Sequence, residues 1–448
     1  MPARMRSGAA IAPARACAYA VVRRVFEQDA YADRALHSEA VHLDGRDRAL
    51  AMALAYGTVQ RRATLDHVIE RLSDRGPEAL DPPVLAALRL GLMQLLLLDG
   101  IADHAAINES VELAKRAGHG GAGLVNAVLR RATREGSAIL AELSDETPEG
   151  AATLHSVPLW LAELWWRELG SDQARALLRR INEPAESALR VNTLLATPPA
   201  VAAQLGPAAR PAPGLAEGLV LEGSFDVYGS ELWSRGAIMA QSRGSMLVGR
   251  ALAPQPGERV LDLCAAPGAK TTHLAAMMGD QGTLHAVERH PGRAQALRRT
   301  LQRMGVGSAA VQVADAANMA RAGPGYDRVL VDPPCSGLGT LQSRPDLRWR
   351  TSPERIADGA GLQARILHAG AAQTRSGGTL VYSVCTISRS ESEAVIADFL
   401  SQHPEFAIDP LRDRDPSKDS DGDETPFLQV LPHRDRTDGF FIARLLRR

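Results

Sequence analysis

From about residue 257 onward, short apolar segments alternate with longer segments whose apolar residues recur at helical spacing. The apolar segments predict strands, which lie at residues 259–263, 283–287, 310–313, 328–331 and 379–383. Strands that alternate with helices in this way are typical of an α/β domain built on a parallel, doubly wound sheet. Ligands of such sheets bind outside the carboxyl ends of the strands, so we expect the chemistry just after each strand.

The part of the chain before residue 135 has a different pattern. Its apolar residues recur at helical spacing throughout, which predicts a small all-helical bundle. Pro82-Pro83 is expected to open the most apolar helix, and Asn108 to cap the helix that follows it. The last three helices of the bundle are expected at residues 84–98, 109–117 and 124–134.

The segment between these two regions mixes signals. Its small and polar residues predict a linker followed by a small α+β subdomain, with a proline-rich loop near its middle. The linker is expected at 135–151, helices at 159–169 and 173–180, a strand at 188–192 and the loop at 197–214. We therefore expect three parts: a helical bundle at 10–138, a small subdomain at 151–235 and the α/β domain at 236–448.

The net charge of −1 gives no global basic signature, so any binding of nucleic acid must come from local patches. One patch is arginine-rich and N-terminal, and a solvated arm explains it equally well; it comprises Arg4, Arg6, Arg15, Arg23 and Arg24. Residues 409–424 are acidic and rich in turn formers, which predicts a surface loop. Arg179, Arg180 and Arg190 could contact phosphates or lie on an exposed structural face.

Residues 84–98 form the longest apolar stretch, which is too short and too interrupted to span a bilayer. Arg15 interrupts the only candidate apolar core of a signal peptide, so a cytoplasmic protein is expected. The spacing of the four cysteines fits no zinc or disulfide framework, and no metal site is expected.

Acidic residues follow or end three of the predicted strands. Asp262 is followed by a tight turn with Pro267 and Gly268, which lets the backbone approach a ligand. Glu288 is placed to hold ribose hydroxyls, and Asp315 follows the third strand. Three such acids without a diphosphate-binding loop favour an adenosine-type cofactor such as S-adenosylmethionine, although surface acids at strand ends are common.

Two thiols follow two strands that adjoin in this kind of sheet. Asp332-Pro-Pro-Cys335 comes after the fourth strand, and Tyr382-Ser-Val-Cys385 comes after the fifth. One thiol alone would more often be a packing cysteine. Two at the active edge suggest that both face one substrate.

Cytosine chemistry explains why two thiols would be useful. Carbon 5 of cytosine is a poor nucleophile until a thiolate adds to carbon 6, which is covalent catalysis. Asp332 is placed to act as an acid near ring nitrogen 3 during the attack. A base must later remove the proton from carbon 5 so that the attacking thiol can leave. On this reasoning either Cys335 or Cys385 could be the nucleophile.

At these residues the chain resembles the bacterial 16S ribosomal RNA cytosine-5 methyltransferases of the Sun/Fmu type, within the NOL1/NOP2/Sun family. The segments that match in order and spacing are 262–272, 331–337 and 382–387, with further likeness at 190–193, 344–349 and 438–441. The N-terminal bundle resembles the fold of the NusB antitermination factor at 47–50, 56–59, 104–111 and 125–131.

The resemblance implies a Rossmann-like, class I S-adenosylmethionine-dependent methyltransferase domain that acts on 16S ribosomal RNA, preceded by an RNA-binding NusB-like bundle. The sequence leaves the oligomeric state open, and we expect a monomer. The resemblance assigns the attack to Cys385 and the release of the product to Cys335, with Asp332 and Lys270 as further catalytic residues. The cofactor contacts that it implies are Cys264, Ala265, Ala266, Pro267, Gly268, Ala269, Lys270, Glu288, Asp315 and Asp332.

The chain departs from the family pattern at positions away from the thiols. Ala269 stands where the family usually has glycine, Glu288 where aspartate is frequent, and Ser392 where asparagine is frequent. Ser242 stands where an acid is common. Two alternatives stay open: a cytosine-5 methyltransferase acting on transfer RNA, and a catalytically weak RNA-binding factor for ribosome assembly. The intact thiols and Asp332 argue against the second, and Cys385 argues against a DNA enzyme, whose nucleophile is the Pro-Cys thiol.

Overall fold

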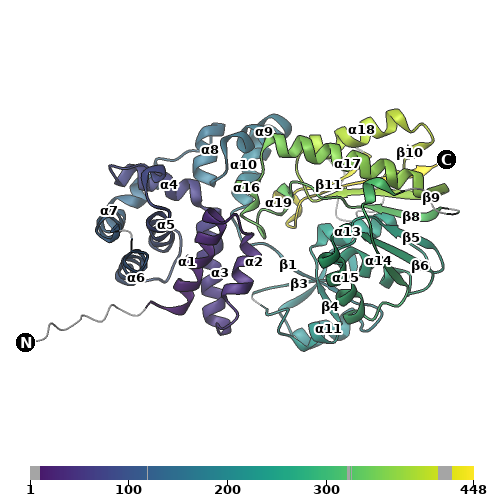
Figure 1. Ribbon diagram of the computed structural model, residues 1–448, viewed down its shortest axis with the longest axis horizontal. Helices are drawn as coiled ribbons and strands as arrows, with labels where there is room; N and C mark the ends of the chain where they lie inside the picture. Colours follow the sequence, from purple (N-terminus) through teal and green to yellow (C-terminus); the bar gives the residue numbers. More distant parts are fainter. Residues whose placement is uncertain (1–10, 119, 224, 320–322, 324, 412–425) are drawn as a thin grey trace, which may run out of the picture. The chain divides into compact units, whose positions relative to one another are not determined.

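The computed structural model describes residues 11–411 and 426–448, except residues 119, 224, 320–322 and 324 (Figure 1). The chain forms two compact units: the first comprises residues 1–182 with 341–350, and the second comprises 183–340 with 351–448. Arg4, Arg6 and most of the acidic segment 409–424 lie outside the described residues. The division at 10–138, 151–235 and 236–448 stays a prediction.

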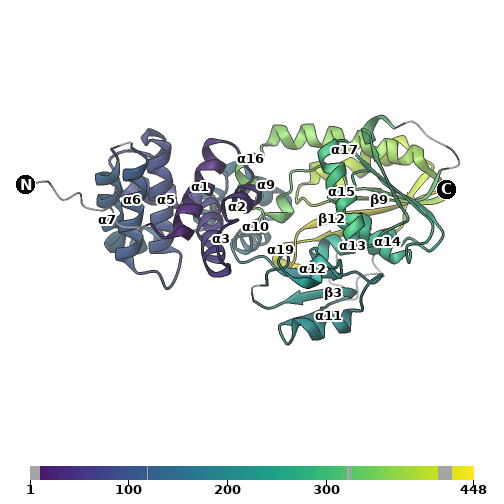
Figure 2. The same ribbon diagram turned by 60° about the horizontal axis from the view of Figure 1, so that its bottom comes forward.

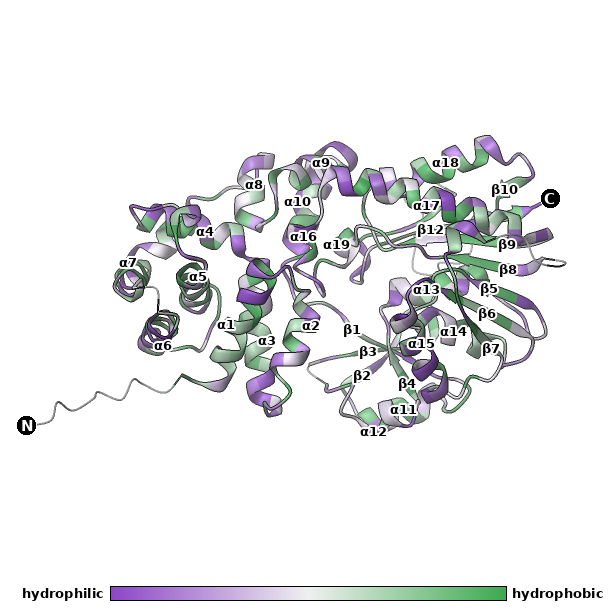
Figure 3. Ribbon diagram, viewed as in Figure 1, coloured by the Kyte–Doolittle hydropathy of each residue, from purple (hydrophilic) through white to green (hydrophobic). Residues whose placement is uncertain are grey.

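The first unit is helical. Its most apolar helix, α5, contacts α1, α3, α4, α6 and α7 and lies at the centre of the bundle, as expected; Figure 3 shows its hydrophobic character. The helices are α1 (Pro13–Glu27), α2 (Ala32–Glu39), α3 (Gly45–Gln60), α4 (Arg62–Leu72), α5 (Pro82–Leu96), α6 (Asp103–Arg116), α7 (Ala122–Ala141), α8 (Pro148–His155), α9 (Leu159–Leu169), α10 (Ser171–Arg180) and α16 (Leu347–Arg350), with a 3-10 turn at Pro77–Ala79.

Two local expectations for this unit were wrong. Asn108 lies inside α6, which begins at Asp103, so it caps nothing. The expected linker at 135–151 is mostly helix, because α7 runs on to Ala141 and α8 begins at Pro148. Gly136 reads as a helix breaker in the sequence, but a Cβ there would come within 2.7 Å of Leu96, so its smallness permits close helix packing.

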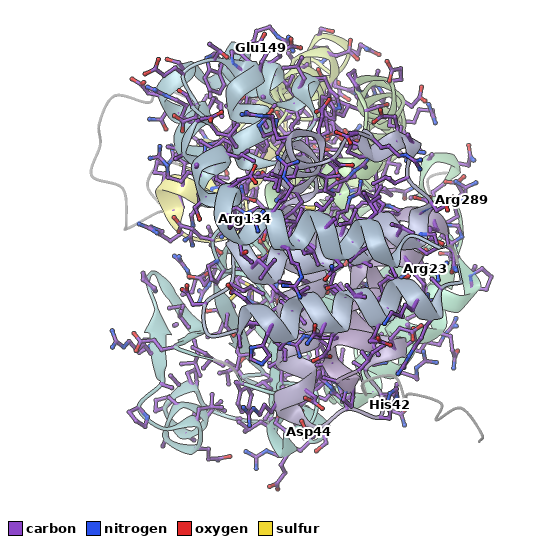
Figure 4. All side chains as sticks on the ribbon, turned by 90° about the vertical axis from the view of Figure 1, so that its left-hand side faces the viewer. Arg23, His42, Asp44, Arg134, Glu149 and Arg289 are labelled. Atoms are coloured by element: carbon purple, nitrogen blue, oxygen red, sulfur yellow. The ribbon has the colours of Figure 1, made fainter. Side chains whose placement is uncertain are left out.

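The arginines that the structure describes near the N-terminus are paired. Arg15 lies 2.9 Å from Glu109, Arg23 lies 2.7 Å from Glu27, and Arg24 lies 2.9 Å from Glu39. All three belong to α1, so the interpretation as a solvated arm is wrong for them. Figure 4 labels Arg23 and Arg134, the second of which keeps 65% of its side chain exposed.

A short segment from far along the chain completes the first unit. Arg348 of α16 is fully buried and donates to the carbonyl oxygens of Ser156 at 3.0 Å and Gln60 at 3.2 Å. Trp349 donates from Nε1 to the carbonyl of Val59 at 2.7 Å. The likeness at 344–349 therefore falls on a structural anchor.

The second unit begins with an antiparallel sheet in the order β2-β3-β1-β4, seen with α11 in Figure 2. The elements are β1 (Ser187–Val191), α11 (Pro198–Leu205), β2 (Ala209–Ala212), β3 (Leu215–Leu221), α12 (Glu231–Ser234) and β4 (Ile238–Ala240). The expected strand at 188–192 is confirmed. The expected loop at 197–214 was wrong, because Pro198-Pro199 opens a helix where no backbone N–H is needed, and Val201 packs into the core.

The main sheet has the order β10-β12-β9-β8-β5-β6-β7, with β11 paired to β12. The five expected strands are confirmed as parallel neighbours: β5 (Arg259–Asp262), β6 (Thr283–Glu288), β7 (Ala309–Val313), β8 (Tyr326–Val331) and β9 (Thr374–Val384). The sequence did not predict the antiparallel strands β10 (Phe406–Ile408), β11 (Leu428–Val430) and β12 (Phe440–Arg447).

Helices cover both faces of the main sheet, as a parallel sheet requires. Val260 and Val381 pack with residues of α13 and α14, whereas Leu261 and Tyr382 pack with residues of α17 and α18. The helices are α13 (Arg243–Leu252), α14 (Ala269–Met277), α15 (Pro291–Arg303), α17 (Pro353–Gln373), α18 (Glu393–Gln402) and α19 (Pro432–Asp435). Among the described residues, no helix is long and apolar enough to cross a membrane.

Candidate active site

The carboxyl ends of β9, β8, β5 and β6 lie side by side, because these strands are parallel neighbours. Asp262 and Glu288 end β5 and β6, while Asp332 and Cys385 follow β8 and β9 directly. Asp315 follows β7 at the same edge. The fold thus brings the candidate residues named from the sequence to one edge of the sheet.

The two thiols are in contact. The sulfur atoms of Cys335 and Cys385 are 3.4 Å apart, and both side chains are partly buried. The hydrogen bond with Cys385 and burial raise the pKa of the Cys335 thiol well above its usual value. The Cys385 loop is also held by its carbonyl oxygen, which accepts from the backbone N–H of Gly339 at 3.0 Å.

Asp332 is held at both of its oxygens. Lys270 Nζ donates to Oδ2 at 2.8 Å, and Ser383 Oγ donates to Oδ1 at 2.7 Å. Burial alone would lower the pKa of Lys270, but the charge and hydrogen bond of Asp332 outweigh it and raise that pKa. Lys270 is therefore an ammonium at neutral pH, and its nitrogen lies 5.1 Å from the centre of the Phe440 ring.

Sequence reasoning assigned no role to Ser383 or Phe440. Ser383 is a polar residue near the end of a mainly apolar strand, and its side chain is buried. A hydroxyl in such a segment could have indicated that Ser383 has a specific partner. Phe440 belongs to the segment 438–441, which was noted only for its likeness to the family.

The turn between β5 and α14, residues 263–268, is fixed mainly by its backbone. The N–H of Ala265 donates to the carbonyl of Val287 at 2.9 Å. Gly268 has a φ of 110°, and a Cβ there would come within 2.8 Å of Leu297, so only glycine fits. Ala269 begins α14 and has no positive φ, so its methyl group causes no backbone strain.

Asp262 and Cys264 line this turn, and the pKa of each side chain is raised. Thr271 Oγ1 donates to Asp262 at 2.7 Å, and burial raises the pKa of Asp262 to about 6. Burial and the charge of Asp262 raise the pKa of Cys264 well above its usual value. Cys264 therefore stays a thiol at neutral pH.

Glu288 and Asp315 present carboxylates beyond β6 and β7. The backbone N–H of His290 donates to Glu288 at 2.8 Å, and that of Ala317 donates to Asp315 at 3.1 Å. Glu288 is buried, whereas Asp315 keeps 34% of its side chain exposed. Arg289, labelled in Figure 4, is exposed and approaches Asp315 only to 4.0 Å.

These groups fit S-adenosylmethionine. Carboxylate oxygens accept hydrogen bonds, and the ribose hydroxyls and adenine amine of that cofactor donate them. The glycine turn allows close approach of a ligand to the backbone. Among the described residues, no cluster of histidine, cysteine and acidic side chains could hold a metal ion.

The structure corrects the interpretation of Arg190. Its side chain is fully buried, so it lies on no exposed face, and burial lowers its pKa to about 9. Nε donates to Gln241 at 2.8 Å and Nη2 donates to Thr272 at 2.7 Å, which braces the start of α14. By contrast, Arg179 is 66% exposed and pairs with Asp145.

Two family departures have local explanations. Ser242 caps α13, because its hydroxyl accepts from the N–H of Ser245 at 3.4 Å. Ser392 is buried before α18 and donates to the carbonyl of Ser388 at 2.7 Å. Among the described residues, neither serine forms a hydrogen bond with Cys335, Cys385 or Asp332.

The Rossmann-like sheet and the groups at its edge define the class of protein: a methyltransferase that uses S-adenosyl-L-methionine. Three family models match the chain: the NusB family at residues 12–134, the ferredoxin-like domain of RsmF/B-like methyltransferases at 157–228, and 16S rRNA methyltransferase RsmB/F at 249–446. The expected NusB-like bundle, small α+β subdomain and Rossmann-like domain are thereby confirmed.

Similar proteins make the particular family plain. A probable ribosomal RNA small subunit methyltransferase B from Synechocystis sp. is 39% identical, over 96% of this chain and 99% of that protein. A ribosomal RNA small subunit methyltransferase B from Thermus thermophilus is 37% identical, over 90% and 89% of the two chains. The crystal structure of PH0851 is 26% identical with a TM-score of 0.81, over 98% of this chain and 100% of that one. The chain belongs to the ribosomal RNA small subunit methyltransferase B family.

Proposed function

We propose that this protein transfers a methyl group from S-adenosyl-L-methionine to carbon 5 of a cytosine in 16S ribosomal RNA, through a covalent bond between Cys385 and the base. The observation that carries the proposal is the contact between the Cys335 and Cys385 sulfurs, 3.4 Å apart beside Asp332. The choice of RNA is supported by the relatives, which are named as methyltransferases of the small-subunit ribosomal RNA.

The first step is attack on the base. The Cys385 thiolate forms a bond to carbon 6, and electron density moves into the ring toward carbon 5 and nitrogen 3. Lys270 Nζ donates to Asp332 at 2.8 Å, and we propose that the Lys270 ammonium gives a proton to the Asp332 carboxyl, which passes its proton to nitrogen 3 and hydrogen-bonds there. Ser383 keeps the Asp332 carboxylate in one orientation during this step.

The cofactor supplies an electrophilic methyl group to carbon 5. We propose that Glu288 and Asp315 hold its hydroxyl and amine groups, and that the turn from Cys264 to Lys270 surrounds the rest. The contacts implied by the family resemblance, Ala265, Ala266, Pro267, Gly268, Ala269 and Asp332, lie on that turn or beside it. Backbone ties hold the turn in place, as described above.

The proximity of the thiols supports a division of roles. Two thiols in contact do not both ionise readily, because the hydrogen bond with Cys385 and burial raise the pKa of the Cys335 thiol. Either sulfur can be the donor in the hydrogen bond between them. The assignment of the attack to Cys385 therefore rests on the family resemblance.

The same coupling supports a role for Cys335 in release. Once Cys385 is bonded to carbon 6, its negative charge is gone, and this removes one cause of the raised pKa of Cys335. Cys335 can then lose its proton to solvent and take the proton from carbon 5. The bond between Cys385 and carbon 6 breaks, the double bond re-forms, and Cys385 leaves as a thiolate.

We further propose that the bundle at 10–138 and the subdomain at 151–235 help to bind the RNA, while 236–448 carries the reaction. The match of residues 12–134 to the NusB family supports the first part. The substrate is tested by bisulfite sequencing of ribosomal RNA from a strain that lacks this protein. Loss of one 16S mark is expected, and an unchanged 16S pattern with a lost transfer-RNA mark would contradict the choice of substrate.

A further inference from the structure

One buried carboxylate lies between the loop of Cys335 and the loop of Cys385. Glu391 ends a 3-10 turn, Arg389–Glu391, and its side chain is fully buried. It has no part in the cofactor contacts or in the ion pair of Asp332. A fully buried carboxylate needs several hydrogen bonds to be tolerated, so its donors show what it holds together.

The donors to Glu391 come from both thiol loops. On the Cys335 side, the N–H of Ser336 donates to Oε1 at 2.9 Å, and the Ser336 hydroxyl donates to Oε2. On the Cys385 side, Thr386 Oγ1 donates to Oε2 at 2.9 Å. The two hydroxyls also contact each other, with 2.7 Å between the Ser336 and Thr386 oxygens. Each of these residues directly follows one of the two thiols.

Glu391 is itself held in place by the sheet and by α17. Gln363 Nε2 donates to Oε1 at 2.9 Å and to the carbonyl of Pro334 at 3.0 Å. The Tyr382 hydroxyl donates to the Glu391 carbonyl at 2.7 Å. Gln363 and Tyr382 are both fully buried. The carboxylate is therefore a fixed point to which both loops are attached.

We propose that Glu391 is a positioning residue that joins the Cys335 loop to the Cys385 loop and so sets the distance between the two thiols. Its effect on catalysis rests on the proposed function, but the geometry does not. If the contact between the two loops were purely structural, neutral side chains could form it at a smaller desolvation cost than a carboxylate. The negative charge has a second use here, because it helps to raise the pKa of Cys335 and to keep that group protonated before the attack.

The test compares three variants with a matched control. Glu391→Ala removes the join, Thr386→Val removes only its Cys385 side with little change of shape, and Glu391→Gln keeps the shape but removes the charge. Glu393→Gln is the control, since Glu393 lies two residues further on and its carboxylate contacts the Ser392 hydroxyl. Cofactor affinity, measured by calorimetry, identifies variants that have lost their fold, because Glu391 contacts no part of the cofactor turn.

The first readout needs neither RNA nor cofactor. Dibromobimane becomes fluorescent when it has reacted with two thiols, and mass spectrometry identifies the bridged peptides. Rapid bridging of Cys335 to Cys385 is expected in the wild type and in Glu393→Gln, with slow bridging in Glu391→Ala and Thr386→Val. A wild type that is bridged rapidly but methylates no RNA would contradict the proposed function and leave this test of Glu391 valid.

The second readout is methyl transfer to RNA. Displacing one thiol by about 1 Å is expected to lower kcat by about 100-fold in Glu391→Ala, with the KM for cofactor unchanged. Glu391→Gln should restore much of the bridging, because the two hydroxyls can turn and accept from its amide. Wild-type bridging in both Glu391→Ala and Thr386→Val would overturn the proposal. If Glu391→Ala fails to bind cofactor, Thr386→Val alone provides the test: slow bridging supports the proposal, and wild-type bridging overturns it.

Discussion

The two halves of the active edge are built differently. At the ends of β8 and β9, side chains hold side chains: Lys270 and Ser383 hold Asp332, and the two thiols contact each other. At the ends of β6 and β7, backbone N–H groups donate to the carboxylates of Glu288 and Asp315 at 2.8 and 3.1 Å, and the side-chain partners of these carboxylates lie farther away, at 3.5 and 3.2 Å. Every residue except proline has a backbone N–H, so a donor of this kind survives most substitutions. A side-chain donor is lost when its residue is replaced.

This difference accounts for two of the four departures from the family pattern noted in the sequence. Ala269 and Glu288 replace the more frequent residues in the half fixed by the backbone, where a changed side chain leaves the supporting bonds in place. The thiol half keeps Asp332, Cys335 and Cys385. The comparison predicts that substitutions in the thiol half lower kcat strongly, and that those in the cofactor half have smaller effects on binding or stability.

Among the residues that support the two thiols, the largest effect is expected for Asp332→Asn. The change removes the charged partner of Lys270 and leaves a buried ammonium without its carboxylate. We expect kcat for methyl transfer to fall by about 1000-fold, since acid–base groups contribute in this range. The control is Asp327→Asn, at the other end of the same strand, where the carboxylate pairs with Arg375. An equal loss in both variants would contradict a specific role for Asp332.

Asp262 is the exception in the cofactor half, because its buried side chain carries a pKa raised to about 6 from an unfolded value of 3.8. A raised pKa means that stability is fully present below about pH 4 and is lost as pH rises through about 6. Asp262→Asn should remove this loss. Relative to wild type, its free energy of unfolding should rise by about 3 kcal/mol between pH 4 and pH 7.

Urea unfolding at a series of pH values measures this difference. The two curves should converge near pH 4 and separate as pH rises toward 7. Curves that stay parallel over the whole range would show that folding does not raise the pKa of Asp262.

Ser383→Ala sharpens the account of the thiol half. Loss of the hydrogen bond to Asp332 should lower kcat by about 10- to 100-fold, because a hydrogen bond to a charged group contributes about 1.5–3 kcal/mol. Ser376→Ala is the matched control on the same strand, since Ser376 donates to the carbonyl of Arg448 at 2.9 Å. Steady-state kinetics on both variants should separate them, and equal rates would show that Asp332 keeps its orientation without Ser383.

The smallest effect is expected for Ala269→Gly, which restores the residue usual in the family. Because Ala269 has no strained φ, the KM for S-adenosylmethionine should stay unchanged. The free energy of unfolding should fall by less than about 1 kcal/mol, since glycine is a poorer helix former than alanine. A markedly tighter KM would show that the Ala269 methyl group obstructs the cofactor.

The sequence predicted the five parallel strands because each is a short, mainly apolar run between helical segments, and it placed the thiols correctly because the ends of such strands share one edge. It failed where a role depends on contacts between distant segments. Ser336 and Glu391 are 55 residues apart, and no local pattern connects them. The strand β12 is defined by its pairing with β9, which a local pattern does not show.

Arg190 illustrates a different limit. An arginine in a mixed segment is most simply read as exposed, but here the strand β1 is buried at four consecutive positions, Ala188 to Val191. Gln241 and Thr272, supplied by other elements, accept hydrogen bonds from its guanidinium and help to make its burial possible. The prediction of a loop at 197–214 was wrong for a local reason, because prolines that suggest a loop also suit the first turn of a helix.

The assignment of the attack to Cys385 is tested most directly by trapping the covalent adduct. Purified Cys335→Ser and Cys385→Ser proteins are incubated with 16S ribosomal RNA and S-adenosylmethionine, and RNA-linked protein is separated under denaturing conditions. We predict that Cys335→Ser accumulates the adduct, because addition proceeds without release, and that Cys385→Ser forms none and methylates nothing. An adduct in Cys385→Ser and none in Cys335→Ser would show that the roles of the two thiols are reversed.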